Sequence, residues 1–167
     1  MFAQDAISPQ IAALKDFQQK ISDYISLERN CAKGISVNKP SNEPHVIQER
    51  QHELARKIRE ARNKARQGEI FTPSVAKEFR RLLGLAMAGK NDGDIEKSLA
   101  RAEPVRVNLQ VNDNYPSNVP LQSMPPTILL NLPRLPPELE YLINGHALVL
   151  HDTAANLIVD IIPDAVP

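Results

Sequence analysis

Residues 139–162 constrain the fold more strongly than any other part of the chain. Two apolar runs flank Asn144-Gly145, a dipeptide that accepts the positive φ angles of a type I′ hairpin turn. A third apolar run follows the turn-forming stretch 152–156. This pattern predicts a three-stranded antiparallel β meander over residues 138–163.

Both predicted faces of this sheet are apolar, whereas a sheet with one face in water alternates apolar and polar residues. The residues are Tyr141, Ile143, Leu148 and Leu150 on one face and Leu142, Val149, Ile158 and Ile161 on the other. We therefore expect helices to cover one face and a proline-rich segment or a second subunit to cover the other. The meander is also where we expect a second copy of the chain or a cell-envelope protein to bind.

Two helices begin with the same signal, a hydroxyl residue that can cap the helix followed by a proline. Ser8-Pro9 opens a helix whose apolar residues recur every three or four positions through about Arg29. Thr72-Pro73 opens another, with a broader apolar face, which runs to about Ala88. The broader face predicts a central position for this helix.

Between them, a helix is predicted over residues 44–68, capped by Ser41 or Asn42 and ended by Gly68. Its apolar stripe is narrow, and small alanines would let it pack closely against the first helix as a helical hairpin. The stripe consists of Ile47, Leu54, Ile58, Ala61 and Ala65.

The other face of this helix is basic, with seven cations against three carboxylates: Arg50, Arg56, Lys57, Arg59, Arg62, Lys64 and Arg66 against Glu49, Glu53 and Glu60. Such a face can hold phosphates of nucleic acid or lipid headgroups. A solvated helix surface is the favoured interpretation, because Glu53 and Glu60 stand four residues before Lys57 and Lys64. Nucleic acid is therefore not the expected partner.

After the third helix the pattern becomes more irregular. A short fourth helix is predicted over residues 95–102, and a strand over 105–111, where apolar and polar residues alternate. Seven prolines between 115 and 137 exclude a long helix, yet the same segment is rich in leucine. We expect an ordered strap lying across the other elements, with a helical turn near 127–132.

Composition narrows the class of protein. A chain of 167 residues is long enough for one domain with its own core. Because 20 basic residues balance 20 acidic ones, no overall electrostatic field favours a partner of one charge. Aromatic residues make up only 4%, which predicts an aliphatic core. The single cysteine, Cys31, excludes an internal disulfide and is expected to be a buried thiol, with a reactive thiol as the alternative. No apolar run reaches 18 residues, so no membrane span is predicted.

Histidines and carboxylates are the candidate metal ligands and catalytic residues of this chain. His45 and His52 lie about two helical turns apart, roughly 10 Å, too far to chelate one ion. His146 and His151 would point to opposite faces of one strand. Two possibilities stay open: a metal site combining either of these with Glu138, Glu140 or Asp152, and an enzyme pocket in which two of Glu138, Glu140, Asp152 and Asp160 converge with a raised pKa.

No known phosphate loop, nucleophile elbow or metal motif occurs. The sequence nominates no catalytic residue and no cofactor, and it leaves any metal ligand unknown. At the N-terminus, Phe2-Ala3-Gln4-Asp5 reads like the start of a mature exported protein with a methionine placed in front. The alternative is an ordinary cytosolic start.

The C-terminal pattern resembles a β module of small exported bacterial proteins. Its residues are Leu135-Pro136-Pro137, Leu139-Glu140-Tyr141, Gly145, Leu148-Val149-Leu150, Asp152, Asn156-Leu157-Ile158-Val159-Asp160 and Ile162-Pro163. It is similar to the terminal hairpin of periplasmic proteins of nickel and cobalt homeostasis, and to uncharacterised exported proteins of soil bacteria. The resemblance implies an envelope location, and no metal ligand is carried over from it.

Together these patterns predict an α+β fold in one domain, residues 1–167. A helical part at 8–103 with three to four helices precedes the strand and strap at 104–137 and the β meander at 138–163. The expected function is that of a non-enzymatic periplasmic structural or protein-interaction protein. The alternatives are a periplasmic metal-handling accessory protein and an enzyme of unknown reaction.

Overall fold

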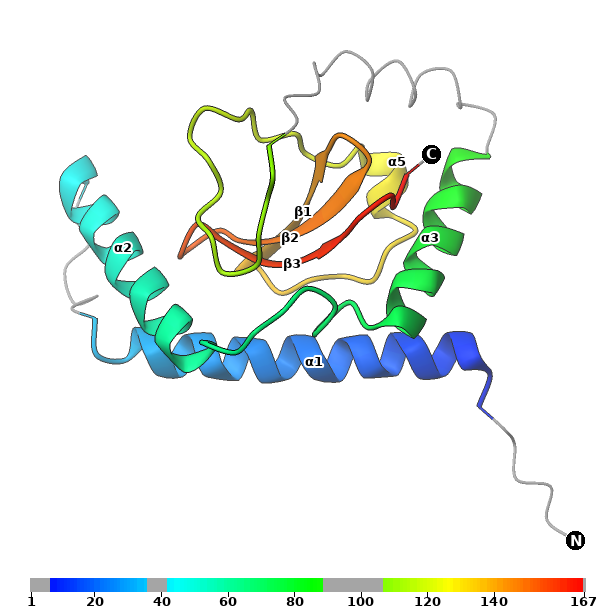
Figure 1. Ribbon diagram of the computed structural model, residues 1–167, viewed down its shortest axis with the longest axis horizontal. Helices are drawn as coiled ribbons and strands as arrows, with labels where there is room; N and C mark the ends of the chain where they lie inside the picture. The colour runs from blue at the N-terminus through cyan, green and yellow to red at the C-terminus, as the bar shows by residue number, and fades with distance from the viewer. Residues whose placement is uncertain (1–6, 36–41, 89–106, 167) are drawn as a thin grey trace, which may run out of the picture.

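The structure is a computed structural model that describes residues 7–35, 42–88 and 107–166 (Figure 1). Its elements are α1 (Pro9–Ala32), α2 (Pro44–Ala61), α3 (Pro73–Met87), α5 (Pro126–Leu129), β1 (Leu139–Asn144), β2 (Ala147–Asp152) and β3 (Leu157–Ile162). The three long helices and the antiparallel sheet, in the order β1-β2-β3, confirm the predicted α+β fold and meander. The helix predicted at 95–102 lies outside the described residues.

The long helix α1 lies along one edge of the molecule, and α2, α3 and the sheet lie on the same side of it (Figure 1). In Figure 1, α2 meets one end of α1, α3 meets the other, and the sheet lies between them. As predicted, α1 starts at Pro9, where the Ser8 hydroxyl accepts a hydrogen bond of 3.3 Å from the backbone N–H of Ile11. It continues to Ala32, slightly beyond the predicted end.

The second helix begins at Pro44, as predicted, but its predicted capping residue and its predicted end were wrong. Glu43, rather than Ser41 or Asn42, precedes its first turn, and its side chain makes no capping hydrogen bond. The helix ends at Ala61, well before Gly68. Gly68 does have the left-handed φ of 88° that favours glycine, but within the connection to α3. The chain leaves the helix early because backbone N–H groups of this connection bind a carboxylate of the sheet, as described below.

The first hairpin turn also differs from the type I′ prediction. Asn144 pairs with Ala147, so the two central residues of the turn are Gly145 and His146. Gly145 has a φ of 60°, and His146 is not among the residues with positive φ. This is the arrangement of a type II′ turn, which places glycine at the first central position. His146 therefore lies in a turn and not on a strand.

The two faces of the sheet carry the residues that the alternation predicted. Tyr141, Ile143, Leu148 and Leu150 belong to the main core with α1, α2, α3 and α5, whereas Leu142, Val149, Ile158 and Ile161 form a second cluster. Tyr115 and Val119 of the strap cover this second cluster, with Val107 and Leu109 at its margin. The strap and its helical turn, observed as α5, are thus confirmed, and it is the strap that covers the second face.

The main core is mostly aliphatic, as expected, and a cluster of aromatic rings lies within it. Phe17 of α1 stacks on Phe71 with ring centroids 5.8 Å apart, and Phe79 of α3 contacts both rings edge-on. Tyr141 of β1 packs on Phe79 at 5.9 Å. The few aromatic residues of the core therefore gather where α1, α3 and the sheet meet.

The predicted strand at 105–111 was wrong for its described part. Residues 107–110 form no strand, and the chain turns at Asn112, whose φ is 70°. The alternation itself was real, since Val107 and Leu109 are half-buried while Asn108 and Gln110 are exposed. An alternating pattern reports which side chains face the core, but a strand also needs a backbone partner.

Both edges of the sheet are occupied by other backbone. At the β1 edge, the Ile143 N–H donates to the Gln122 carbonyl at 3.0 Å. At the β3 edge, Ile158 exchanges hydrogen bonds with Asn112 and Asp113, at 2.8 and 2.9 Å. The strands are therefore closed to further pairing at these positions. Among the described residues, no helix is long and apolar enough to span a membrane.

Candidate functional site

Asp152, one of the four candidate acids, is fully buried at the end of β2. One carboxylate oxygen accepts a 2.7 Å hydrogen bond from the Tyr24 hydroxyl, and the other accepts the Ala155 N–H at 2.9 Å. Burial raises the pKa of the Asp152 carboxyl, and these hydrogen bonds oppose the rise. Asp152 thus ties α1 to the sheet and shapes the turn that follows β2.

Asp160, in the middle of β3, binds the chain between α2 and α3. Its two oxygens accept backbone N–H groups of Gly68, Ile70 and Phe71 at 2.7–2.8 Å, together with the N–H of Ile161. The carboxylate is completely buried, and these donors replace its water. Asp160 is therefore a structural anchor for the connection that ends α2 early.

Glu138 lies at the sheet end facing α1. Its Oε1 accepts two hydrogen bonds from the guanidinium of Arg29, at 3.0 and 3.3 Å, and this pairing lowers the pKa of Glu138. Nearby, burial raises the pKa of Glu28, and the negative charges of Asp152 and Glu138 add to that rise. The charges of Glu28, Glu138 and Asp152 interact with one another, and none of the three lines the pocket described below.

Glu140 is paired with His151, which is buried under the strap. The Nδ1 atom of His151 lies 2.8 Å from Glu140, and its Nε2 lies 2.9 Å from the side-chain oxygen of Asn156. Because the Asn156 amide donates to the Tyr115 carbonyl, its oxygen is the acceptor for the Nε2–H of His151. Both nitrogens of this ring are engaged, so His151 presents no free ligand atom.

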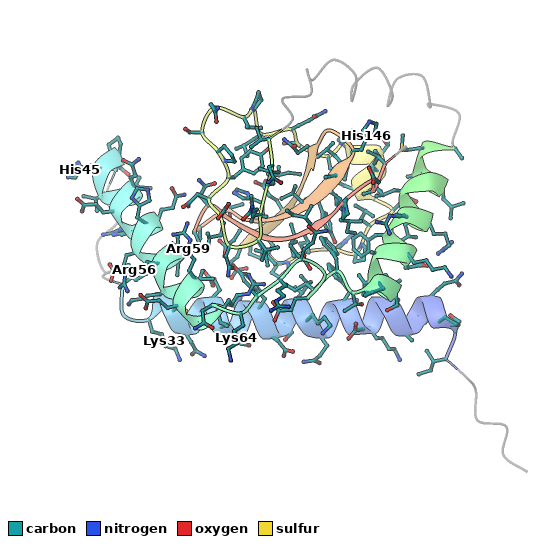
Figure 2. All side chains as sticks on the ribbon, viewed as in Figure 1. Lys33, His45, Arg56, Arg59, Lys64 and His146 are labelled. Carbon is teal, nitrogen blue, oxygen red and sulfur yellow. The ribbon has the colours of Figure 1, made fainter. Side chains whose placement is uncertain are left out.

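The remaining metal candidates are scattered. His45 and His146 lie at opposite sides of the molecule in Figure 2. Among the residues that the structure describes, no three His, Cys, Asp or Glu side chains are grouped so as to hold a metal ion. Cys31 is half-buried at the end of α1, and burial raises the pKa of its thiol, which favours the unreactive protonated form.

The basic face of α2 is only partly the solvated surface that was expected. Arg59 donates to the Asn112 carbonyl at 2.8 Å and to the side chain of Asn114, so it ties the helix to the strap. Arg62 is 8% exposed and donates to the Asn112 side chain and the Val159 carbonyl, while its guanidinium lies 5.1 Å from the Tyr24 ring centre. These two arginines join α2, α1, the strap and β3.

The predicted ion pairs of this helix are half correct. Lys57 lies 3.7 Å from Glu53, as its spacing indicated, but Glu60 pairs with Arg56 instead of Lys64. The helix has already ended at Ala61, so Lys64 is not one turn beyond Glu60. Lys64 lies in the connection, by the half of α1 nearer α2 in Figure 2.

A pocket of about 380 Å³ opens between α1 and this connection. Its volume falls within the roughly 300–1,000 Å³ of small-ligand sites. One wall is a single face of α1, and the other comes from the end of α2 and the following residues. The lining residues are Lys20, Asp23, Tyr24 and Leu27 on α1 and Ala61, Arg62, Asn63, Lys64, Ala65, Glu69 and Ile70 opposite.

The pocket has an ordered floor and a charged rim. Tyr24 and Ile70 on the floor are buried; the Tyr24 hydroxyl donates to Asp152, and the guanidinium of Arg62 lies over the Tyr24 ring. On the rim, the ammonium groups of Lys20 and Lys64 form no ion pair with any described residue. The lining of the pocket therefore combines two cations that lack ion-pair partners, the carboxylates of Asp23 and Glu69, and apolar side chains.

Sequence reasoning did not find this pocket. No sequence pattern marks Lys20 as a binding residue, and the pattern around Lys64 predicts a solvated helix face. The signal that was available is the spacing of Lys20, Tyr24 and Leu27, which places a cation, an aromatic ring and an aliphatic side chain on one helix face. The opposite wall depends on the early end of α2, which no local pattern indicated.

Comparison with known proteins supplies no relative for this chain: no family model, no curated protein and no solved structure matches it.

Proposed function

We propose that this protein is a non-enzymatic periplasmic protein that binds a partner protein at the pocket between α1 and residues 61–70. The observation that carries the proposal is the separation of the pocket from the acidic side chains of the sheet. Asp152 and Asp160 are buried in hydrogen bonds that join helices to strands, whereas Lys20 and Lys64 stand at the pocket rim without ion-pair partners. The acids serve the fold, and the lysines are available to a ligand.

The pocket is favoured over the meander as the binding surface. Every residue of the three strands is buried except Glu140, Asn144 and Ala147. A partner of the sheet would have to contact the covering segments and not the strands. The pocket, in contrast, is open to solvent and is built on side chains that internal contacts already hold in place, which reduces the entropy cost of binding.

The periplasmic location rests on the C-terminal resemblance to exported proteins. It is tested by raising an antibody against the purified protein and probing cell fractions from the source organism. We expect the signal in the periplasmic or envelope fraction, and a signal confined to the cytosolic fraction would reject the location.

The binding role is tested by capture from an envelope extract with three immobilised baits: the unaltered protein, the double variant Lys20→Gln/Lys64→Gln, and Lys77→Gln. Lys77 is an exposed lysine of α3 away from the pocket lining and serves as the control for lost charge. We expect a protein retained by the first and third baits and released by the double variant. The same set of proteins on all three baits would reject the pocket as the binding surface.

A further inference from the structure

His151 lies where the sheet meets the strap, and both of its ring nitrogens face hydrogen-bond acceptors. Its side chain is 5% exposed. Nδ1 lies 2.8 Å from a carboxylate oxygen of Glu140 on β1, and Nε2 lies 2.9 Å from the side-chain oxygen of Asn156, in the turn before β3. A neutral imidazole has one N–H and can donate to only one of these acceptors, whereas an imidazolium has two. The arrangement is therefore that of a ring with both nitrogens protonated.

The amide of Asn156 connects this ring to the strap. Its Nδ2 donates to the Tyr115 carbonyl at 3.3 Å. The backbone carbonyl of Asn156 accepts the N–H of Tyr115 and the side-chain amide of Asn114, both at 3.1 Å. The Tyr115 ring also packs edge-on against the imidazole, with ring centroids 5.6 Å apart. The orientation of the Asn156 amide thus decides whether its NH2 group or its oxygen faces the Tyr115 carbonyl.

The other charged groups near His151 do not compete for its ring nitrogens. Asp152 follows it in β2, and the two charges attract one another, but the carboxylate oxygens accept hydrogen bonds from other groups. On β3 the residue opposite His151 is the apolar Ile158. Arg59 of α2 donates to the strap, in which Asp113 is exposed. The carboxylate of β1 is therefore the acidic partner of the ring.

Loss of one proton from this ring leaves a single N–H for the two acceptors. A carboxylate is a stronger acceptor than an amide oxygen, so the remaining proton stays on Nδ1, beside Glu140. The bare Nε2 then faces the oxygen of Asn156, and the Asn156 amide reverses to offer an N–H instead. Its oxygen now faces the Tyr115 carbonyl. The strap loses a hydrogen bond at this point, and two acceptors face each other in its place.

We propose that Glu140, His151 and Asn156 form a pH-sensitive latch, which holds the strap at Tyr115 while His151 carries two protons and weakens that contact when one proton is lost. Histidine changes charge between about pH 5 and 8, so the latch holds in mild acid and weakens in mild alkali. The strap covers the second apolar cluster of the sheet, so a weakened latch gives solvent more access to that cluster. The latch does not involve the pocket and is independent of the proposed function.

Amide hydrogen exchange of the full chain, followed by NMR at about pH 5 and about pH 9, measures the latch on either side of this range. The reporter is the Tyr115 N–H, which donates to the Asn156 carbonyl, and the reference is the set of amides in the middle of α1. After correction for the intrinsic effect of pH on exchange, we expect the protection of the Tyr115 N–H relative to α1 to fall about tenfold, as for the loss of one hydrogen bond. Unchanged relative protection would overturn the proposal.

Glu140→Gln distinguishes the latch from an ordinary ion pair. A glutamine there can donate to Nδ1, so a neutral ring keeps its proton on Nε2 and Asn156 keeps its orientation. We therefore expect the Tyr115 N–H of this variant to stay protected at both pH values. A simple ion pair would instead lose protection at both, and that result would overturn the proposal. The control Glu49→Gln removes an exposed carboxylate of α2 and should retain the tenfold change.

The protons on the ring are observed directly in the unaltered protein, so this readout does not depend on the folding of a variant. Long-range proton–nitrogen correlation spectra distinguish protonated from bare ring nitrogens. We expect protons on both nitrogens of His151 in mild acid and on Nδ1 alone in mild alkali. A proton on Nε2 alone in mild alkali would overturn the latch, because the Asn156 amide would then have no reason to reverse.

Discussion

The hydroxyl of Tyr24 donates a 2.7 Å hydrogen bond to Asp152, and the two residues are 128 positions apart in the chain. Both side chains are buried, one on α1 and the other at the end of β2. Burial is the main reason that the pKa of Tyr24 is raised, with the charge of Asp152 as the second cause, so the phenol stays protonated and remains the donor. This contact joins α1 to the sheet and fixes the position of Tyr24, which lines the pocket.

Replacing Tyr24 with phenylalanine removes the donor and leaves the buried Asp152 carboxylate with one partner fewer. We expect the free energy of unfolding at pH 7 to fall by about 1.5–3 kcal/mol, the range for hydrogen bonds to charged groups. Urea titration followed by circular dichroism measures it. Tyr141→Phe is the matched control: it removes a neutral hydrogen bond to the Pro133 carbonyl and should cost only about 1 kcal/mol. An equal loss in the two variants would contradict the importance assigned to the Asp152 charge.

The raised pKa of Asp152 makes stability depend on pH in a defined direction. A carboxyl whose pKa is raised in the folded protein contributes stability that is fully present below its unfolded pKa, and loses it as the pH rises through the folded value. Asp152→Asn keeps an acceptor for the Ala155 N–H but cannot ionise. The stability of the unaltered protein relative to this variant should therefore decrease as the pH rises above roughly 4, the pKa of an ordinary aspartate.

The unaltered protein and Asp152→Asn are compared by urea titration at several pH values. Because Glu28 also has a raised pKa and Glu138 a lowered one, the pH dependence of either protein alone mixes several groups. The difference between the two proteins isolates Asp152. A relative stability that increases towards neutrality would mean that the hydrogen bonds to Asp152 outweigh its burial.

Local patterns predicted the elements of this fold, but not the contacts between them. The Ser8-Pro9 and Thr72-Pro73 signals and the turn after Asn144 depend on residues within a few positions of one another, and each marked a true element boundary. The hydrogen bond from Tyr24 to Asp152 depends on how α1 meets the sheet, which has no local signature. The sequence therefore showed candidate acids without showing that they are structural.

The same reasoning explains why the pocket was not predicted. Its second wall exists because α2 stops at Ala61 and the following chain turns to reach Asp160. Gly68 was correctly identified as a left-handed residue, but the usual position of such a glycine at a helix end placed the boundary too late. Tertiary hydrogen bonds outweigh the helical preference of residues 62–67. Lys64 therefore lies at the pocket rim and not, as predicted, on a helix face.

Removing the Asp160 carboxylate should have the largest effect on stability. In Asp160→Ala the buried N–H groups of Ile70 and Phe71 and the partly buried N–H of Gly68 lose their acceptor. We expect a loss of about 3 kcal/mol or more, at about 1–3 kcal/mol for each unsatisfied group. Asp113→Ala is the matched control, because Asp113 is exposed and its change should lie within about 0.5 kcal/mol. Chemical denaturation of both variants measures the difference, and similar losses would show that Asp160 is no anchor.

Replacing glycine with alanine should change the stability of the protein in opposite directions at two positions. Gly145 lies in the hairpin turn and has a φ of 60°. A Cβ added there would meet no atom within 4 Å, but an L residue is strained at this φ. Gly145→Ala should therefore destabilise the protein by about 1–2 kcal/mol. Gly84 lies within α3, also with open space around an added Cβ and with no such positive φ, so Gly84→Ala should stabilise it by about 0.5–1 kcal/mol. Thermal and urea unfolding of the two variants measure both shifts. Because neither Cβ clashes, shifts of the same sign would show that backbone conformation does not govern these two positions.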